Sequence, residues 1–292
     1  MSLRFLATGA LTAAVLLSAC SGGSESSDVD PGAATQGARY VAIGDSFVSG
    51  PLIDPADPDE PACLRSKRNY PALLAEALGE TSVKDVSCAG ETTSTLTMGR
   101  TLPGGTVVRS QLDAVTPSAR LVTVGIGAND EAATAGLFTY CLVTATATDD
   151  ACQKFATTLM PEAYPTIREN VVEVLSKVKE RAPRAKVLLT GYLRISPSSG
   201  SCADLPVTSV TRRGSLAWEK GINEVLADAA READVTFVDV RGVSEGHDAC
   251  AGDGQKWVNG LTAAPGDGSA AHPTEAGMEQ VAQQVLQAAG GA

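Results

Sequence analysis

Residues 40–50 read YVAIGDSFVSG, and this stretch decides how the chain folds. The apolar run Tyr40–Ile43 predicts a buried strand, and the glycine at position 44 allows the backbone to turn sharply where that strand ends. Ser46 then lies at the corner between strand and loop, with its hydroxyl facing a cleft.

Similar apolar runs alternate with helical patterns along the chain. We expect further strands at Val83–Val86, Leu121–Val124, Val187–Thr190 and Val235–Val240. We expect helices at Tyr70–Leu78, Pro161–Arg181, Thr211–Ala233 and Pro273–Ala289. Short strands separated by helices predict an α/β fold, a flavodoxin-like three-layer sandwich around a parallel sheet of roughly five strands. Ligands bind beyond the carboxyl ends of such strands.

Three further segments follow predicted strands or precede the last helix. They are CAGETT at 88–93, GIGAND at 125–130 and AHPTEAG at 271–277. Taken singly, Gly90 is typical of a turn and Asn129 of a helix cap. Taken together with Ser46, they predict acyl-transfer chemistry. A serine needs a base such as His272, and a tetrahedral oxyanion needs fixed donors, here the N–H groups of Ser46 and Gly90 and the amide of Asn129.

In order and spacing, these four segments resemble the conserved blocks of the SGNH (GDSL-like) hydrolases, and the resemblance spans residues 40–277. It implies the SGNH hydrolase fold, a catalytic pair of Ser46 and His272, and an oxyanion hole of Ser46, Gly90 and Asn129. It implies no metal and no cofactor. The segments around Cys63–Ser66 and Gly246–Cys250 resemble the actinobacterial secreted esterase and lipase branch.

The chain departs from the wider family just before the histidine. An Asp three residues earlier usually orients the base, but this position holds Ser269. Several members of the actinobacterial branch use a main-chain carbonyl instead, so we expect the carbonyl of Ser269 or a neighbour to orient His272, with Asp267 as the less favoured third member. The other histidine, His247, is either a cleft residue or structural, and we expect Asp45 to organise the turn before Ser46.

Seven cysteines include Cys20 near the N-terminus and six others. An even number in an exported chain favours disulfides, and six allow fifteen pairings. We choose sequential pairing because each bond would then close one loop-bearing insertion: Cys63–Cys88, Cys141–Cys152 and Cys202–Cys250. The actinobacterial branch also has three disulfides. A zinc site is the weaker alternative, because no C-x-x-C spacing occurs and only two histidines are present.

The N-terminus predicts export. A basic Arg4, an apolar run and the ending LSAC at 17–20 resemble a bacterial lipoprotein signal. We therefore expect a signal peptide at 1–19, a lipidated Cys20 followed by a flexible tether at 20–37, and a catalytic domain at 38–292. An uncleaved membrane helix is the alternative, although the run is short for one.

The net charge of -11 argues against a nucleic-acid partner and against simple adhesion to anionic lipid. We expect a monomeric serine esterase or lipase, exported and held at the cell membrane by its lipid or secreted, that acts on a small-molecule or lipid ester. Two alternatives stay open. One is an envelope acyltransferase of the same fold, in which an alcohol replaces water, and the other is a non-catalytic lipoprotein binding module.

Overall fold

The computed structural model describes residues 37–252 and 254–290, and the part of the chain from Gly37 onward is one compact unit. The predicted signal peptide and tether lie outside the described residues. The central sheet has five strands, β1 Tyr40–Gly44, β2 Val83–Asp85, β5 Leu121–Gly125, β6 Lys186–Thr190 and β7 Thr236–Val238. All five predicted strands are present. The last is shorter than expected because Asp239 caps a short helix, α8 Val240–Val243.

The strands are parallel and follow the order β2-β1-β5-β6-β7, which confirms the predicted flavodoxin-like fold. β1 and β5 are paired along their whole length, and the pairing ends with Gly44 beside Gly125. β1 is also paired with β2 on its other side, so the connection after β1 leads to one edge of the sheet and the connection after β5 leads toward the other. The carboxyl ends of β1 and β5 therefore form the crevice in which α/β sheets bind ligands.

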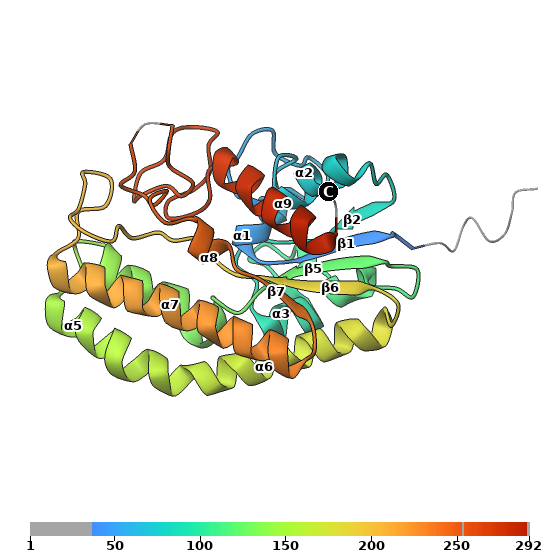
Figure 1. Cartoon of the computed structure of the whole chain (residues 1–292), viewed down its shortest axis with the longest axis horizontal. Helices are drawn as coiled ribbons and strands as arrows, with labels where there is room; N and C mark the ends of the chain where they lie inside the picture. Colours follow the sequence, from blue (N-terminus) through green and yellow to red (C-terminus); the bar gives the residue numbers. More distant parts are fainter. Residues whose placement is uncertain (1–36, 253, 291–292) are drawn as a thin grey trace, which may run out of the picture. The chain divides into compact units, whose positions relative to one another are not determined.

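Four long helices cover the two faces of the sheet (Figure 1). They are α2 Tyr70–Leu78, α6 Met160–Arg181, α7 Ser209–Glu232 and α9 Glu275–Ala289. The pair α6 and α7 packs on one face and the pair α2 and α9 on the other. In α6 the residues Ile167, Val171 and Val178 are all buried, which is the apolar stripe that the sequence predicted.

The last helix begins later than the sequence predicted. We expected its first turn at Pro273, but Thr274 is the N-cap and its hydroxyl accepts the N–H of Gly277, so α9 starts at Glu275. Pro273 instead pairs with Val258 in an isolated bridge. The residues before α9 are consequently loop, and this loop carries His272.

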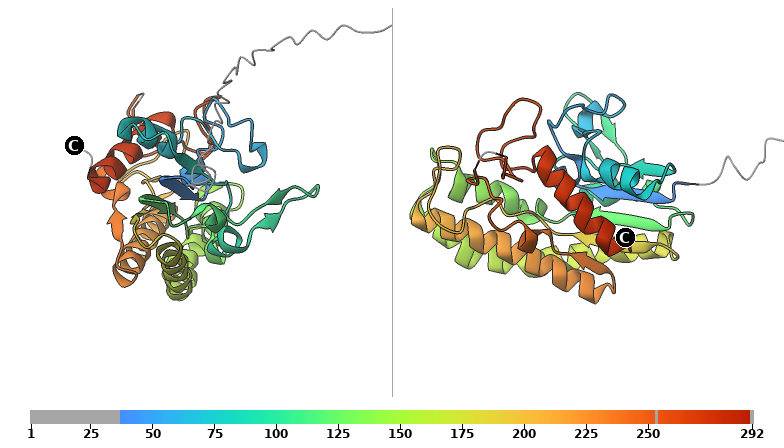
Figure 2. Two further views of the ribbon diagram at one scale, coloured as in Figure 1. Left: turned by 90° about the vertical axis from the view of Figure 1, so that its right-hand side faces the viewer. Right: turned by 45° about the horizontal axis from the view of Figure 1, so that its top comes forward.

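Shorter elements, which the sequence did not predict, connect the strands and the long helices. The helical ones are α1 Ser46–Ser49, η2 Pro61–Cys63, α3 Thr93–Met98, η3 Gln111–Ala114, η4 Asp130–Ala132, α4 Ala133–Leu137, η5 Phe138–Leu142, α5 Asp149–Lys154 and η6 Phe155–Leu159. A small hairpin of β3 Arg100–Thr101 and β4 Val107–Val108 projects from the body of the domain (Figure 2).

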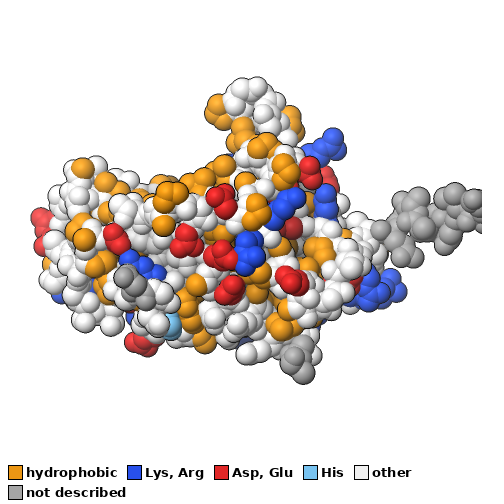
Figure 3. Space-filling model, turned by 90° about the horizontal axis from the view of Figure 1, so that it is seen from above, with side chains coloured by type: hydrophobic (Ala, Val, Ile, Leu, Met, Phe, Trp, Pro, Cys, Tyr) orange, Lys and Arg blue, Asp and Glu red, His pale blue; other side chains and the backbone are white. Residues whose placement is uncertain are grey.

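On the face seen in Figure 3, acidic and basic side chains are interspersed with small hydrophobic areas, and no extended basic surface is visible. Among the described residues no helix is long and apolar enough to cross a membrane.

Candidate active site

Ser46 is the first residue of α1, directly after the end of β1. The turn requires Gly44, because a Cβ there would lie 2.4 Å from the carbonyl oxygen of Gly125. Gln111 clamps this glycine from both sides, since its amide donates to the Gly44 carbonyl over 2.9 Å and accepts the Gly44 N–H over 2.7 Å. The serine hydroxyl is therefore held at a rigid corner and is partly exposed.

His272 reaches Ser46 from the loop before α9. Its Nε2 lies 2.8 Å from Ser46 Oγ, and its Nδ1 lies 2.8 Å from the main-chain oxygen of Ala270. A carbonyl oxygen can only accept, so Nδ1 carries the proton and Nε2 of the neutral ring is free to accept the serine proton. Burial lowers the pKa of His272, and the hydrogen bond to Ala270 opposes part of this effect. The ring is thus in the tautomer that a general base needs.

Two residues considered as orienting groups have other partners. The Ser269 carbonyl accepts the backbone N–H of His272 over 3.2 Å, so the neighbouring Ala270, and not Ser269, contacts the ring. The carboxylate of Asp267 accepts the N–H of Glu275 over 2.9 Å, at the start of α9. Between Ala270 and His272, Ala271 has a φ of 54° and is buried. This left-handed residue turns the chain so that the Ala270 carbonyl points back at the imidazole.

The three expected oxyanion donors come from the ends of neighbouring strands. Within the described residues no hydrogen bond occupies the backbone N–H of Ser46 or of Gly90. Asn129 follows β5, and its Nδ2 donates one hydrogen to the Glu91 carbonyl over 2.9 Å. Among the residues that the structure describes, the second hydrogen of that amide donates to no acceptor. The amide is therefore fixed by the residue next to Gly90 and keeps one donor for a ligand.

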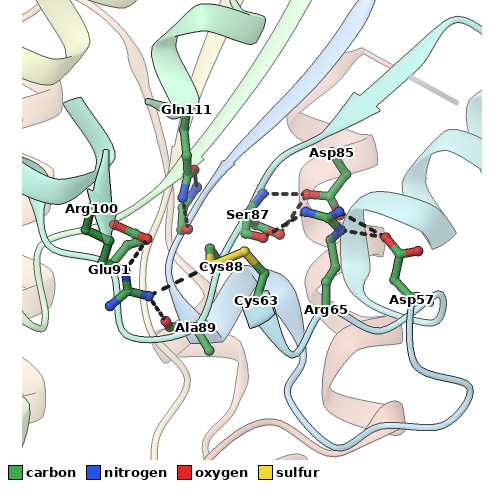
Figure 4. Close-up of a disulfide and its surroundings, with 11 residues drawn as sticks. Asp57, Cys63, Arg65, Asp85, Ser87, Cys88, Ala89, Glu91, Arg100 and Gln111 are labelled. Carbon is green, nitrogen blue, oxygen red and sulfur yellow. Dashed lines mark hydrogen bonds and ion pairs between the residues drawn. A yellow bond between two sulfur atoms is a disulfide. The ribbon is translucent and has the colours of Figure 1, made fainter. Parts of the chain in front are cut away.

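The segment that carries Gly90 is pinned on several sides (Figure 4). The disulfide Cys63–Cys88 lies immediately before it, and the N–H of Cys88 donates to the Gly44 carbonyl over 3.0 Å. The Arg100 guanidinium donates to the Ala89 carbonyl over 2.7 Å and forms an ion pair of 3.0 Å with Glu91. Gly90 itself is left-handed, with a φ of 77°.

On the opposite side of the disulfide from Arg100, a second arginine holds the residues around the two cysteines (Figure 4). Arg65 donates to the Asp57 carboxylate over 2.9 Å and to the Ser87 carbonyl over 3.0 Å. Ser87 donates in turn to Asp85 through its N–H and its hydroxyl. The positions of Cys63 and Cys88 are thus fixed by polar contacts as well as by their covalent bond.

Two acidic residues next to the candidate catalytic residues, Asp45 and Asp130, organise the backbone. Asp45 caps α1 by accepting the N–H of Phe47 over 2.9 Å, as the sequence predicted for this turn. Its complete burial raises the pKa of the carboxyl group to about 7, although hydrogen bonds from Tyr192 and Phe47 oppose the rise. Asp130 accepts the N–H and the hydroxyl of Thr93 over 2.8 and 2.5 Å, which joins the segment after β5 to α3.

A narrow hollow, with an enclosed volume of only about 10 Å³, lies beside Ser46. Catalytic candidates line its polar side, Ser46, Asn129 and His272. Apolar side chains from several elements line the rest, namely Phe47, Leu137, Phe138, Ile195 and Trp218. No sequence signal marks these apolar residues, since buried Leu, Ile and Trp look the same in any core.

The remaining sequence candidates take structural positions. His247 stacks on Trp257 with ring centroids 3.9 Å apart, and its Nδ1 contacts the Gln255 carbonyl over 2.7 Å. The other two disulfides join Cys141 to Cys152 and Cys202 to Cys250, which completes the sequential pairing. In the part of the chain that the structure describes, no cluster of three His, Cys, Asp or Glu residues could hold a metal ion.

Comparison with known proteins identifies the family. Residues 42–280 match the model of the GDSL-like lipase/acylhydrolase family. Lipase 2 of Streptomyces coelicolor is 32% identical over 275 residues, which cover 89% of this chain and 88% of that protein.

Two solved structures show the same architecture. The extracellular lipase of Streptomyces rimosus is 29% identical with a TM-score of 0.72 and covers 86% of this chain and 98% of its own. Phospholipase A1 of Streptomyces albidoflavus is 27% identical with a TM-score of 0.73 and covers 86% and 99%. The chain therefore belongs to the GDSL-like lipase/acylhydrolase family and is a carboxylic ester hydrolase.

Proposed function

We propose that the enzyme cleaves its ester through an acyl-enzyme on Ser46, with His272 as general base. The observation that carries this proposal is the distance of 2.8 Å between His272 Nε2 and Ser46 Oγ, in a ring whose tautomer is set by Ala270. Ser46 Oγ attacks the ester carbonyl while Nε2 takes its proton. His272 then protonates the leaving alcohol, and it later activates the water that hydrolyses the acyl-enzyme.

The negative charge on the carbonyl oxygen falls among three donors. These are the backbone N–H groups of Ser46 and Gly90 and the remaining amide hydrogen of Asn129. Donors of this kind are effective because they are already in place and need no reorganisation when the charge develops. The contacts that fix them are the Asn129–Glu91 hydrogen bond and the Arg100–Ala89 hydrogen bond.

The acyl chain of the ester would lie against the apolar side of the hollow. Phe47, Leu137, Phe138, Ile195 and Trp218 present hydrocarbon to it. Burial of a methylene there is favourable by about 0.8 kcal/mol.

We further propose that the protein is exported and anchored through an acylated Cys20. The supports are the LSAC sequence at 17–20, three disulfides of a kind that persist in oxidising compartments, and a relative described as extracellular. Metabolic labelling with an alkyne fatty acid tests the anchor. Label should appear on the parent protein and be lost in Cys20→Ser, and label retained in that variant would refute acylation at Cys20.

A fluorophosphonate probe tests the nucleophile, because it reacts only with an activated serine. Parent protein should be labelled and should hydrolyse p-nitrophenyl esters, and Ser46→Ala should do neither, with a loss in kcat of about 10⁶. Ser49→Ala is the matched control, since Ser49 lies on the same helix but is fully buried. Labelling that persists in Ser46→Ala would overturn the assignment. Turnover that rises with an added acceptor alcohol, with ester of that alcohol as product, would assign acyl transfer instead.

A further inference from the structure

Tyr192 lies behind the catalytic edge, two residues after the end of β6. It is 3% exposed, and its ring packs edge-on against Phe47 with centroids 5.1 Å apart. Its main chain is held by α7, because the Asn223 side chain accepts the Tyr192 N–H over 2.9 Å and donates to the Tyr192 carbonyl over 3.2 Å. The side chain thus projects from a fixed base toward the crevice between β1 and β5.

The hydroxyl group of Tyr192 joins two segments that are far apart in the sequence. It donates to Asp45 Oδ2 over 2.6 Å and accepts the backbone N–H of Ala128 over 3.1 Å. The directions are fixed because the N–H can only donate and an ionised carboxylate can only accept. One partner precedes Ser46 by one residue, and the other precedes Asn129 by one residue.

A connection at this place is needed because the sheet no longer provides one. The β1–β5 ladder ends at Gly44 and Gly125, and the last hydrogen bond that continues it runs from the Asp45 N–H to the Gly125 carbonyl over 2.9 Å. Ser46 and Asn129 both lie past that point. Burial also makes the Tyr192 hydrogen bonds strong, since bulk water does not compete for the Tyr192 hydroxyl or the Asp45 carboxylate.

We propose that Tyr192 is a positioning residue that sets the separation between the nucleophile at Ser46 and the oxyanion donor at Asn129. This inference rests on the proposed function. Loss of the hydroxyl frees Ala128 and Asp45 from one another, so the Asn129 amide moves away from the oxyanion while substrate binding in the apolar hollow is largely kept. A displacement of about 1 Å can lower a rate by about a hundredfold.

The direct test is Tyr192→Phe, assayed on a soluble p-nitrophenyl ester. We expect kcat to fall by about tenfold to a hundredfold with little change in KM. The matched control is Tyr40→Phe, because Tyr40 is 1% exposed and its hydroxyl also makes a buried hydrogen bond, of 3.0 Å to Thr123, in the core. Thermal unfolding of both variants reports the structural cost. A kcat of Tyr192→Phe equal to that of Tyr40→Phe would overturn the proposal.

A double-mutant cycle with Asn129→Ala separates positioning from general destabilisation. If Tyr192 acts through Asn129, then Tyr192→Phe should change kcat by less than about twofold once the amide is absent. An undiminished loss in the Asn129→Ala background would refute the coupling. Should Tyr192→Phe fail to fold, Asp45→Asn weakens the same link from its other end, because a neutral amide oxygen replaces the charged acceptor of the Tyr192 hydroxyl, and it must show the same non-additivity. Failure of the proposed function is recognised separately, because the parent protein would then show no Ser46-dependent labelling.

Discussion

The imidazole of His272 is oriented by the main-chain carbonyl of Ala270, 2.8 Å from Nδ1, and not by a carboxylate. A carbonyl dipole fixes the tautomer as a carboxylate does, but it brings no full negative charge to stabilise the imidazolium that forms during the reaction. The nearest acid considered from the sequence, Asp267, is engaged at the start of α9. We therefore propose a catalytic dyad with main-chain support, and this proposal makes clear predictions.

Substitutions at the two former candidates should leave most of the activity. We expect Asp267→Asn and Ser269→Ala to keep kcat within about tenfold of the parent, a barrier change of roughly 1.4 kcal/mol, because neither side chain orients the ring. His272→Ala, by contrast, should remove nearly all activity. Steady-state kinetics on the three variants check this. A thousandfold loss in a folded Asp267→Asn would show that Asp267 is a third catalytic member, since loss of such an acid costs about 10⁴.

Asn129→Ala should lower kcat by about 10²–10³ with little change in KM, because its amide stabilises charge that develops only in the transition state. Asn170→Ala is a suitable control, since this asparagine makes only a 3.4 Å contact to Asp130 and lies away from the hollow. A variant with raised KM and unchanged kcat would show that Asn129 binds the ground state instead.

The pH dependence of kcat/KM should follow the ionisation of His272. Only the neutral ring accepts a proton, so activity rises as pH rises through its pKa, and burial places that pKa below 6.5. We expect half-maximal kcat/KM on the acid side of pH 6.5. An acid limb centred near pH 7 or above would point to another group, of which Asp45, with a pKa of about 7, is the first candidate.

The acyl hollow predicts a change in chain-length preference. Phe138→Ala enlarges the apolar side, so the ratio of kcat/KM for long-chain to short-chain p-nitrophenyl esters should rise. This ratio does not depend on the fraction of folded enzyme. Tyr140→Ala, from the same segment but outside the residues that line this hollow, should leave the ratio unchanged. An equal change of this ratio in both variants would show that the hollow does not determine acyl selectivity.

The three disulfides should differ in their effect on catalysis. Each native bridge is expected to contribute about 2–4 kcal/mol to the free energy of unfolding. Cys63→Ser/Cys88→Ser should also lower kcat, because this bridge holds the segment with Gly90, whereas Cys202→Ser/Cys250→Ser should mainly lower the melting temperature. Alkylation of the unreduced domain should find no free thiol besides an unacylated Cys20. Two or more reactive cysteines would contradict the pairing.

Much of the fold follows from periodicity that is visible in the sequence. Runs such as Leu121–Val124 and the buried stripe of α6 each repeat one signal over several residues, so such a pattern rarely arises by chance. The short helices α3 to α5 and the hairpin lack such repetition. Their ends are set by single caps, such as Thr92 for α3, and by tertiary contacts. The start of α9 was misplaced for the same reason, because Thr274 and not Pro273 provides the cap.

The candidate site divides along similar lines. The sequence predicted Ser46, Gly90 and Asn129 because distinctive residue types follow strand ends, and His272 because it precedes the last helix. Ala270 contributes only a main-chain oxygen, which any residue would supply, so no sequence signal marks it. Tyr192 acts through one hydroxyl on a ring that otherwise resembles a core residue, and only the positions of Asp45 and Ala128 reveal its connections.

The bridge between Cys63 and Cys88 has a consequence for when the enzyme becomes active. In the reducing cytoplasm thiols stay unpaired, so a newly made chain lacks the covalent tie beside Gly90. With the export proposed above, the oxyanion donors would be fully assembled only after oxidation, on the far side of the cytoplasmic membrane. Oxidative maturation would then act as a safeguard, because a hydrolase that is incomplete during synthesis spares the lipids and other esters of the cell that produces it.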